Sequence, residues 1–342
     1  MKFDFCIGNP AYQESMDATS DKPVYNFFMD EAYKIADKVE LITPARFLFR
    51  AGKTSSEWNE KMLNDKHFKV LFHEQNSTNI FPNTDIKGGV AITYRDKTKD
   101  YGGIKVFTVY PELNSLLEKV THRKDFQPLS ELVYSPESYK FSDEFHKEVS
   151  DAKERMSAGH YYDIVTNIFT KFPDVFLNEK PEDSNSYIRI IGLDNTSKRC
   201  EKWIKESYIK PHENLGKWKV ILPKANGSGA IGEVLSTPLV GQPLVGHTQT
   251  FISIGKYDTE HEANALFKYI KGKFSRTMLG ILKVTQDNKK SVWKFVPLQD
   301  FSSNSDIDWN VSIANIDRQL YKKYGLSDEE INFIETHVKE ME

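Results

Sequence analysis

Short apolar runs with the period of a strand alternate with longer segments of helical period over the first hundred residues. Residues 3–7 predict a strand, because apolar and polar side chains alternate there, and Gly8 with Asn9-Pro10 ends it in a tight turn. The pattern further predicts helices over 23–38 and 58–63 and strands over 39–42, 68–72 and 89–94. This order is typical of the second half of a doubly wound α/β sheet, whose chemistry lies at the carboxyl ends of the strands.

A second domain is expected beyond residue 125, because prolines and charged helical pieces interrupt the pattern between residues 121 and 185. Strands are predicted over 187–191, 218–222 and 250–254, and a long helix over 258–282. The serine and glutamate of Ser327-Asp328-Glu329-Glu330 form a capping box that begins a last helix. The expected domains are residues 1–125, 126–305 and 306–342.

Length and composition fit two globular cores rather than a disordered or secreted protein. The chain has 342 residues, 39% hydrophobic and 28% charged, with a formal net charge of -3. Cys6 and Cys200 lie far apart, so we expect neither a disulfide framework nor a metal site. No cleavable signal and no apolar run of membrane length is found, so a cytoplasmic protein without membrane contact is expected. Any contact with nucleic acid must come from local basic patches.

The turn Asn9-Pro10-Ala11-Tyr12 follows the first strand directly and carries the candidate chemistry. An exocyclic amine on adenine is a poor nucleophile, because its lone pair is delocalised into the ring. Acceptors for its protons increase the electron density on nitrogen, and the Asn9 side-chain oxygen and the Pro10 carbonyl could both accept. Tyr12 would give a flat face to a base flipped from the duplex. Alternatively, Asn9-Pro10 only ends a strand and Tyr12 packs in a core.

This turn resembles the Asn-Pro-Pro-Tyr motif of DNA N6-adenine methyltransferases, in particular the large methylases of restriction-modification systems, with Ala11 in place of the second proline. The resemblance implies a Rossmann-like methyltransferase sheet and a target-adenine pocket at Asn9, Pro10 and Tyr12. It also implies that Phe81, in an aromatic-proline loop before the last hairpin strand, contacts the flipped base. The alternative for Phe81 is a buried anchor of the hairpin.

The resemblance also implies S-adenosylmethionine as methyl donor, held by a Phe-x-Gly-x-Gly segment upstream of the motif. Only two residues precede the predicted first strand, so the donor-binding half is expected on a partner chain, or the chain is a truncated product. The first strand should then expose an unpaired, apolar edge. The G-x-G-x-x-G pattern at 227–232 is not expected to replace that half, because prolines and glycines follow it in place of a helix.

The second domain resembles the α+β target-recognition domain of these methylases, which implies double-stranded DNA as partner. Candidate phosphate contacts are Lys219, Lys224, Lys271 and Arg276. A solvated basic helix face is the ordinary explanation of the last two.

The sequence thus predicts a site-specific DNA adenine methyltransferase that is incomplete without its cofactor-binding half. The alternatives are a non-catalytic DNA-binding specificity module and a half-enzyme completed by a partner chain.

Overall fold

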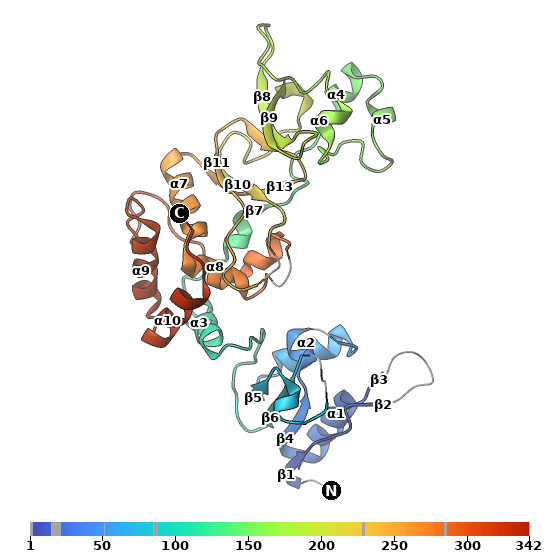
Figure 1. Cartoon of the computed structure of the whole chain (residues 1–342), viewed down its shortest axis with the longest axis vertical. Helices are drawn as coiled ribbons and strands as arrows, with labels where there is room; N and C mark the ends of the chain where they lie inside the picture. Colours follow the sequence, from blue (N-terminus) through green and yellow to red (C-terminus); the bar gives the residue numbers. More distant parts are fainter. Residues whose placement is uncertain are drawn as a thin grey trace. The chain divides into compact units, whose positions relative to one another are not determined.

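The computed structural model of the chain describes residues 3–14, 22–50, 52–84, 86, 88–227, 230–283 and 286–341 (Figure 1). Residues 15–21, which follow the Asn9–Tyr12 turn closely, lie outside these residues. Two compact units are present, Met1–Asn114 (unit 1) and Ser115–Glu342 (unit 2). The assignment of functional domains at residues 125 and 305 stays a prediction. None of the described helices is long and apolar enough to cross a membrane.

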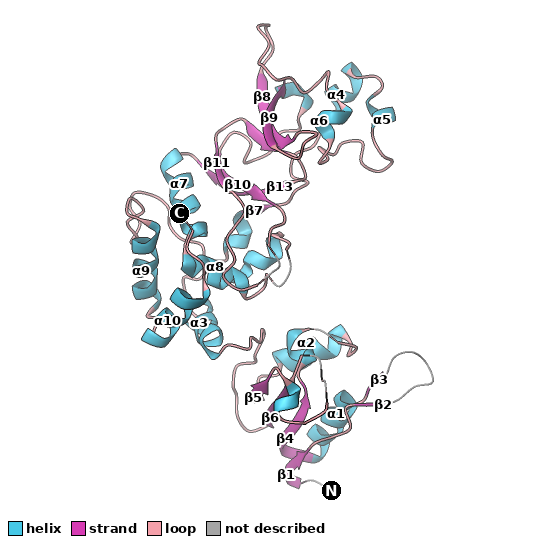
Figure 2. Ribbon diagram, viewed as in Figure 1, coloured by secondary structure: helices cyan, strands magenta, loops and turns pink. Residues whose placement is uncertain are grey.

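Unit 1 is built on a mixed sheet flanked by helices (Figure 2), as the α/β prediction requires. Its elements are β1 (Phe3–Gly8), β2 (Gln13–Glu14), β3 (Lys22–Pro23), α1 (Tyr25–Ile35), β4 (Ala36–Pro44), the 3-10 helix η1 (Arg46–Phe49), α2 (Ser56–Asn64), β5 (Phe68–Glu74), η2 (Ser77–Asn79) and β6 (Val90–Asp96). Helix α3 (Pro111–Thr121) spans the division between the units.

The strand order in this sheet is β1-β4-β6-β5. Strand β1 is parallel to β4, and β6 is antiparallel to both β4 and β5. The carboxyl ends of β1, β4 and β5 therefore share one edge of the sheet. We call this the carboxyl edge; its described residues are 9–12, 45–50, 75–84, 86, 88 and 89. The loops after β4 and β5 are joined there, because Ala45 N–H donates to the Gly89 carbonyl.

Helix α1 packs on the sheet through Met29 and Ala32, which are buried against the β4 side chains Val39 and Leu41. The expected helix over 23–38 is too long, because α1 ends at Ile35. Residues 36–38 extend instead, since Ala36 and Lys38 are the β4 partners of the first residues of β1. Pairing across the sheet thus overrides the local helical pattern.

Strand β1 has β4 as its only strand neighbour among the described residues, so its other edge is unpaired, as expected. Its apolar side chains Phe3, Phe5 and Ile7 are exposed, Ile7 to 73%. Two aromatic residues of α1, Phe27 and Phe28, are exposed as well. An unpaired strand edge beside apolar surface is a template for association.

Unit 2 contains two further sheets, with orders β11-β10-β13-β7 and β12-β8-β9. Its other elements are η3 (Leu129–Leu132), β7 (Val133–Tyr134), α4 (Asp143–Glu148), α5 (Ala152–Arg155), α6 (Ile168–Lys171), β8 (Tyr187–Leu193), β9 (Arg199–Lys205), η4 (Glu206–Tyr208), β10 (Trp218–Pro223), β11 (Leu239–Gly241), β12 (Val245–His247), β13 (Phe251–Tyr257), α7 (Glu260–Lys271), α8 (Lys273–Gly280), η5 (Lys290–Phe295), α9 (Ile313–Tyr324) and α10 (Asp328–His337). The three strands expected here are confirmed as β8, β10 and β13.

The carboxyl-terminal helices pack on α8 and belong to the compact body of unit 2. Phe274 of α8 stacks on Tyr324 of α9 with ring centroids 5.0 Å apart, and Lys273 pairs with Glu335 of α10 at 2.5 Å. The expected capping box is present, because the side chain of Ser327 accepts from the backbone N–H of Glu330 and the Glu330 side chain accepts in return.

The expected long helix over 258–282 is two helices, which is a correction. Helix α7 ends and α8 begins at Gly272, whose backbone is extended. The Asp317 carboxylate accepts hydrogen bonds from the backbone N–H groups of Lys273 (2.8 Å) and Phe274 (3.0 Å). Asp317 therefore caps α8 from another helix, a partner that a local pattern cannot reveal.

Replacing Gly89 with alanine is expected to lower the unfolding free energy of unit 1 by about 3 kcal/mol. Its φ is +80°, and a β-carbon there would overlap the Glu74 carbonyl and lie 2.7 Å from Gln75 Cα. Hydrogen exchange of the β5 and β6 amides measures the loss. Gly102→Ala is the control, because φ is +82° but nothing lies within 4 Å. Equal losses in both variants would contradict the steric argument.

Asp317→Asn is expected to change how stability depends on pH. Burial raises the pKa of Asp317 to about 6, so the folded state binds this proton more tightly than the unfolded state. The resulting stabilisation is complete below pH 4 and disappears as pH rises through 6. The unfolding free energy of the unchanged chain, measured with denaturant, should therefore fall between pH 4 and 7 by on the order of 2–3 kcal/mol relative to that of the variant. A pH-independent difference would contradict this assignment.

Candidate functional site

The Asn9–Tyr12 turn leaves β1 at the carboxyl edge and is held against the start of α1. Short strands β2 and β3 pair just beyond it, with Gln13 opposite Pro23. The backbone carbonyl of Tyr12 accepts from Val24 N–H at 3.2 Å. These bonds fix the end of the turn at Tyr12, and the pairing of β1 with β4 as far as Gly8 fixes its start.

Asn9 and Pro10 keep their acceptors available. The Asn9 side chain is exposed, and neither its oxygen nor the Pro10 carbonyl accepts a hydrogen bond of ordinary geometry from the described residues. Two oxygen acceptors thus stand close together at the end of β1.

The Tyr12 ring is half-buried and its hydroxyl is shielded from solvent. This oxygen makes no hydrogen bond of ordinary geometry with the described residues. Burial raises the pKa of the Tyr12 phenol, and the neighbouring Asn9 side chain offsets part of that rise. The phenol is therefore neutral at physiological pH and presents an uncharged aromatic face.

Phe81 lies beside Tyr12, although 69 positions of sequence separate them. The two ring centroids are 6.4 Å apart and the planes meet at 69°, an edge-to-face contact. The buried Ser77 organises the Phe81 loop: its carbonyl accepts from Phe81 N–H at 2.8 Å, and its hydroxyl donates to the Thr84 carbonyl at 2.7 Å. The structure thus brings all four predicted residues of the adenine pocket to one edge.

Arg46 is a cation at this edge that the sequence analysis did not single out. It follows the end of β4 in Thr43-Pro44-Ala45-Arg46, and its side chain is exposed. The sequence feature that could have identified Arg46 is a charged residue directly after a buried strand.

Lys219 is not where a phosphate contact needs it, and that prediction is corrected. Its side chain is fully buried, and its Nζ donates to the backbone carbonyls of Asn214 (2.7 Å), Lys217 (2.9 Å) and Leu215 (3.1 Å). Burial lowers its pKa to about 7. The side chain stabilises the turn before β10 and cannot reach solvent.

Arg276 and Lys271 are also buried, so the basic helix face expected there is corrected as well. Arg276 donates to the carbonyls of Gly232 (3.1 Å), Glu233 (3.2 Å) and Lys339. The Lys271 Nζ lies 4.7 Å from the Phe267 ring centroid. Arg276 thus joins α8 to residues 232–233 and to the carboxyl-terminal segment, whereas the Lys271 contact lies within α7.

Lys224 is the one predicted phosphate contact whose side chain the structure leaves exposed. It follows β10 directly, and its backbone bonds to Thr250 and Asn288 fix its place.

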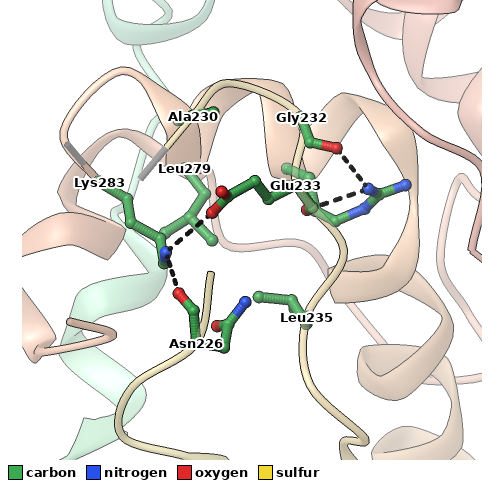
Figure 3. A pocket seen from close by; sticks show the side chains of 9 residues that line it. Asn226, Ala230, Gly232, Glu233, Leu235, Leu279 and Lys283 are labelled. Atoms are coloured by element: carbon green, nitrogen blue, oxygen red, sulfur yellow. Dashed lines mark hydrogen bonds and ion pairs between the residues drawn. The ribbon is translucent and has the colours of Figure 1, made fainter. Parts of the chain in front are cut away.

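The glycine-rich segment 227–232 does not form a cofactor cradle. Residues 228 and 229 lie outside the described part, and no helix follows the segment. Figure 3 shows the small pocket beside it, where Lys283 donates to the Asn226 carbonyl at 2.9 Å and pairs with Glu233 at 3.6 Å. The Glu233 carboxylate fills the space beside Gly227. An acidic side chain in that place repels an anionic ligand.

In the part of unit 1 that the structure describes, no strand lies on the far side of β1. The described residues also contain no group of three or more metal-ligating side chains.

Comparison with known proteins relates the amino-terminal part of the chain to one family. Residues 1–81 match the family of the Eco57I restriction-modification methylases. An uncharacterised adenine-specific methylase of Mycoplasma pneumoniae is 33% identical over 95 residues. That match covers 26% of this chain and 22% of the relative.

Two solved restriction enzymes show weak structural likeness. They are the type IIG restriction endonuclease BpuSI, at 9% identity over 93% of this chain and 48% of that one, and the type IIL restriction-modification enzyme MmeI in complex with DNA, at 11% identity over 97% and 56%. Both TM-scores are 0.33, too low to carry an argument about the fold.

The match over residues 1–81 includes β1, the Asn9–Tyr12 turn, β4 and the aromatic loop as far as Phe81. This segment is thus similar to the Eco57I restriction-modification methylases and to an adenine-specific methylase, of which the chain spans less than a quarter.

Proposed function

We propose that the chain takes part in methyl transfer from S-adenosylmethionine to the N6 amine of a DNA adenine, and that its carboxyl edge is the pocket for the flipped base. The observation that carries this proposal is the meeting of Tyr12 and Phe81 beside two open acceptors, Asn9 and Pro10. If these four residues only packed in a hydrophobic core, all of them would be buried. Instead, both rings are half-exposed and Asn9 faces solvent.

The proposed role of Asn9 and Pro10 is to accept the two protons of the adenine amine. Both bonds hold the amine in one orientation and increase the electron density on its nitrogen, so the gain is largest as positive charge develops there. The Tyr12 face supplies stacking for the purine. Phe81 now meets Tyr12 with its edge, and rotation of its side chain would let it cover the other face of the base.

The sheet supports assignment of unit 1 as the target-base half of a doubly wound methyltransferase domain. Its parallel β1 and β4, joined by α1, and its antiparallel β6 give the strand sequence of such a half. We therefore place donor binding on elements that pair with the free edge of β1. Those elements would come from a partner chain or from a longer form of this protein.

A non-catalytic DNA-binding module is the second candidate, because the described residues offer no place for the methyl donor. In unit 2, Lys224 remains the proposed phosphate contact. The two candidates differ in whether the carboxyl edge supports turnover once the donor half is supplied.

Asn9→Ala is expected to lower kcat about 10²- to 10³-fold in a methyl-transfer assay on duplex DNA with the chain that supplies the donor half. The amine then loses one of its two acceptors, whereas affinity for DNA changes little. The exposed Asn310→Ala in unit 2 is the matched control and should retain full activity. Equal activity of the Asn9 variant would exclude the catalytic role.

Calorimetric titration of the isolated chain with S-adenosylmethionine is expected to give no saturable heat. Unit 1 as described lacks a strand-turn-helix beyond β1 to hold the donor. A parallel titration with duplex DNA at low salt controls for the integrity of the sample. Tight donor binding by the chain alone would contradict the half-domain assignment, while leaving the adenine pocket open to test.

A further inference from the structure

The side chain of Arg46 packs on the loop that carries Phe81, which places it at the carboxyl edge beside the proposed base pocket. A β-carbon on Gly88 would lie 2.6 Å from Arg46 Cγ, so the arginine stem packs directly on the loop that carries Phe81. The preceding Ala45 N–H donates to the Gly89 carbonyl at 3.0 Å. Tyr12, on the other side of the proposed pocket, is held by Val24, whose N–H donates to the Tyr12 carbonyl.

The arginine is placed by the backbone rather than by an acidic partner. Gly88 has a φ of +86° and Gly52 has a φ of +96°. A β-carbon on Gly52 would lie 3.3 Å from Arg46 Cβ. Both positions lack a side chain where the arginine stem crosses them. Among the described residues, no carboxylate pairs with the Arg46 guanidinium and no carbonyl accepts from it. The other two arginines of unit 1 are both paired, Arg50 with Glu60 and Arg95 with Asp65.

We infer that Arg46 binds a phosphodiester of the DNA strand that carries the target adenine, next to the extruded nucleotide. This inference rests on the proposed function. An extruded base swings out on its backbone, which brings its flanking phosphates to the rim of the pocket. A guanidinium held at that rim, with no partner among the described residues, suits a phosphate in charge and in geometry. Arg46 is then a binding residue that orients the strand, and Gly88 is a positioning residue.

The test is fluorescence anisotropy of the full chain with two DNA duplexes, one fully paired and one in which a central adenine lacks a pairing partner. The unpaired adenine lowers the cost of extrusion, so the unchanged chain should bind the second duplex more tightly. Arg46→Gln should weaken binding of that duplex about tenfold. The slope of log affinity against log salt should fall by about 0.9, as for one lost phosphate contact.

Lys97→Gln is the matched control. Lys97 is an exposed cation that follows β6 at the opposite edge of the same sheet, so its variant removes the same charge away from the pocket. It should leave both affinity and slope close to those of the unchanged chain. Gly88→Ala retains the charge but displaces the arginine stem, and should weaken binding of the unpaired duplex with only a small change in slope.

Two results would overturn the inference. If the unchanged chain binds both duplexes and Arg46→Gln behaves as Lys97→Gln does, Arg46 makes no phosphate contact, while the proposed function stands. If the unchanged chain binds neither duplex, both the inference and the proposed function fail. A third measurement tests whether Arg46 binds the methyl donor instead of DNA. If Arg46→Gln lowers the affinity of the completed enzyme for S-adenosylmethionine and leaves its affinity for DNA unchanged, Arg46 is reassigned to the methyl donor.

Discussion

The parallel pairing of β1 with β4 is the constraint on which the candidate site depends. The pairing runs from Phe3 opposite Ala36 to Gly8 opposite Leu41. It places the carboxyl ends of both strands at the same edge of the sheet. The turn after β1 and the loop after β4 then become neighbours. Because β6 returns antiparallel between β4 and β5, the loop that ends at β6 joins them. The loops at this edge thus carry two hydrogen-bond acceptors, two aromatic rings and Arg46, although they are far apart along the chain.

Local sequence was sufficient where the cause of the structure is local. Alternation identified β1, a capping box identified the start of α10, and a strand followed by Asn9-Pro10 identified the turn. The meeting of Tyr12 with Phe81 was expected only through resemblance to a family, because no local pattern relates two residues so far apart. The contact itself is tertiary.

Prediction failed where a distant partner decides the outcome. A continuous helical pattern over residues 258–282 gives no sign that Asp317 caps a new helix at Lys273. Lys219 and Arg276 look like solvated cations in sequence, yet each has several backbone carbonyls as partners in the interior. Burying a long cationic side chain is favourable only when such acceptors converge on it. Those carbonyls belong to turns that the sequence does not place.

The hairpin of β5 and β6 carries Phe81, whereas Tyr12 belongs to a separate segment anchored on α1. The two rings therefore belong to different parts of unit 1. Under the proposed function, substitutions in the hairpin would change the spacing between the rings and leave the Asn9 and Pro10 oxygens in place. Entry of a base and alignment of its amine could then diverge independently.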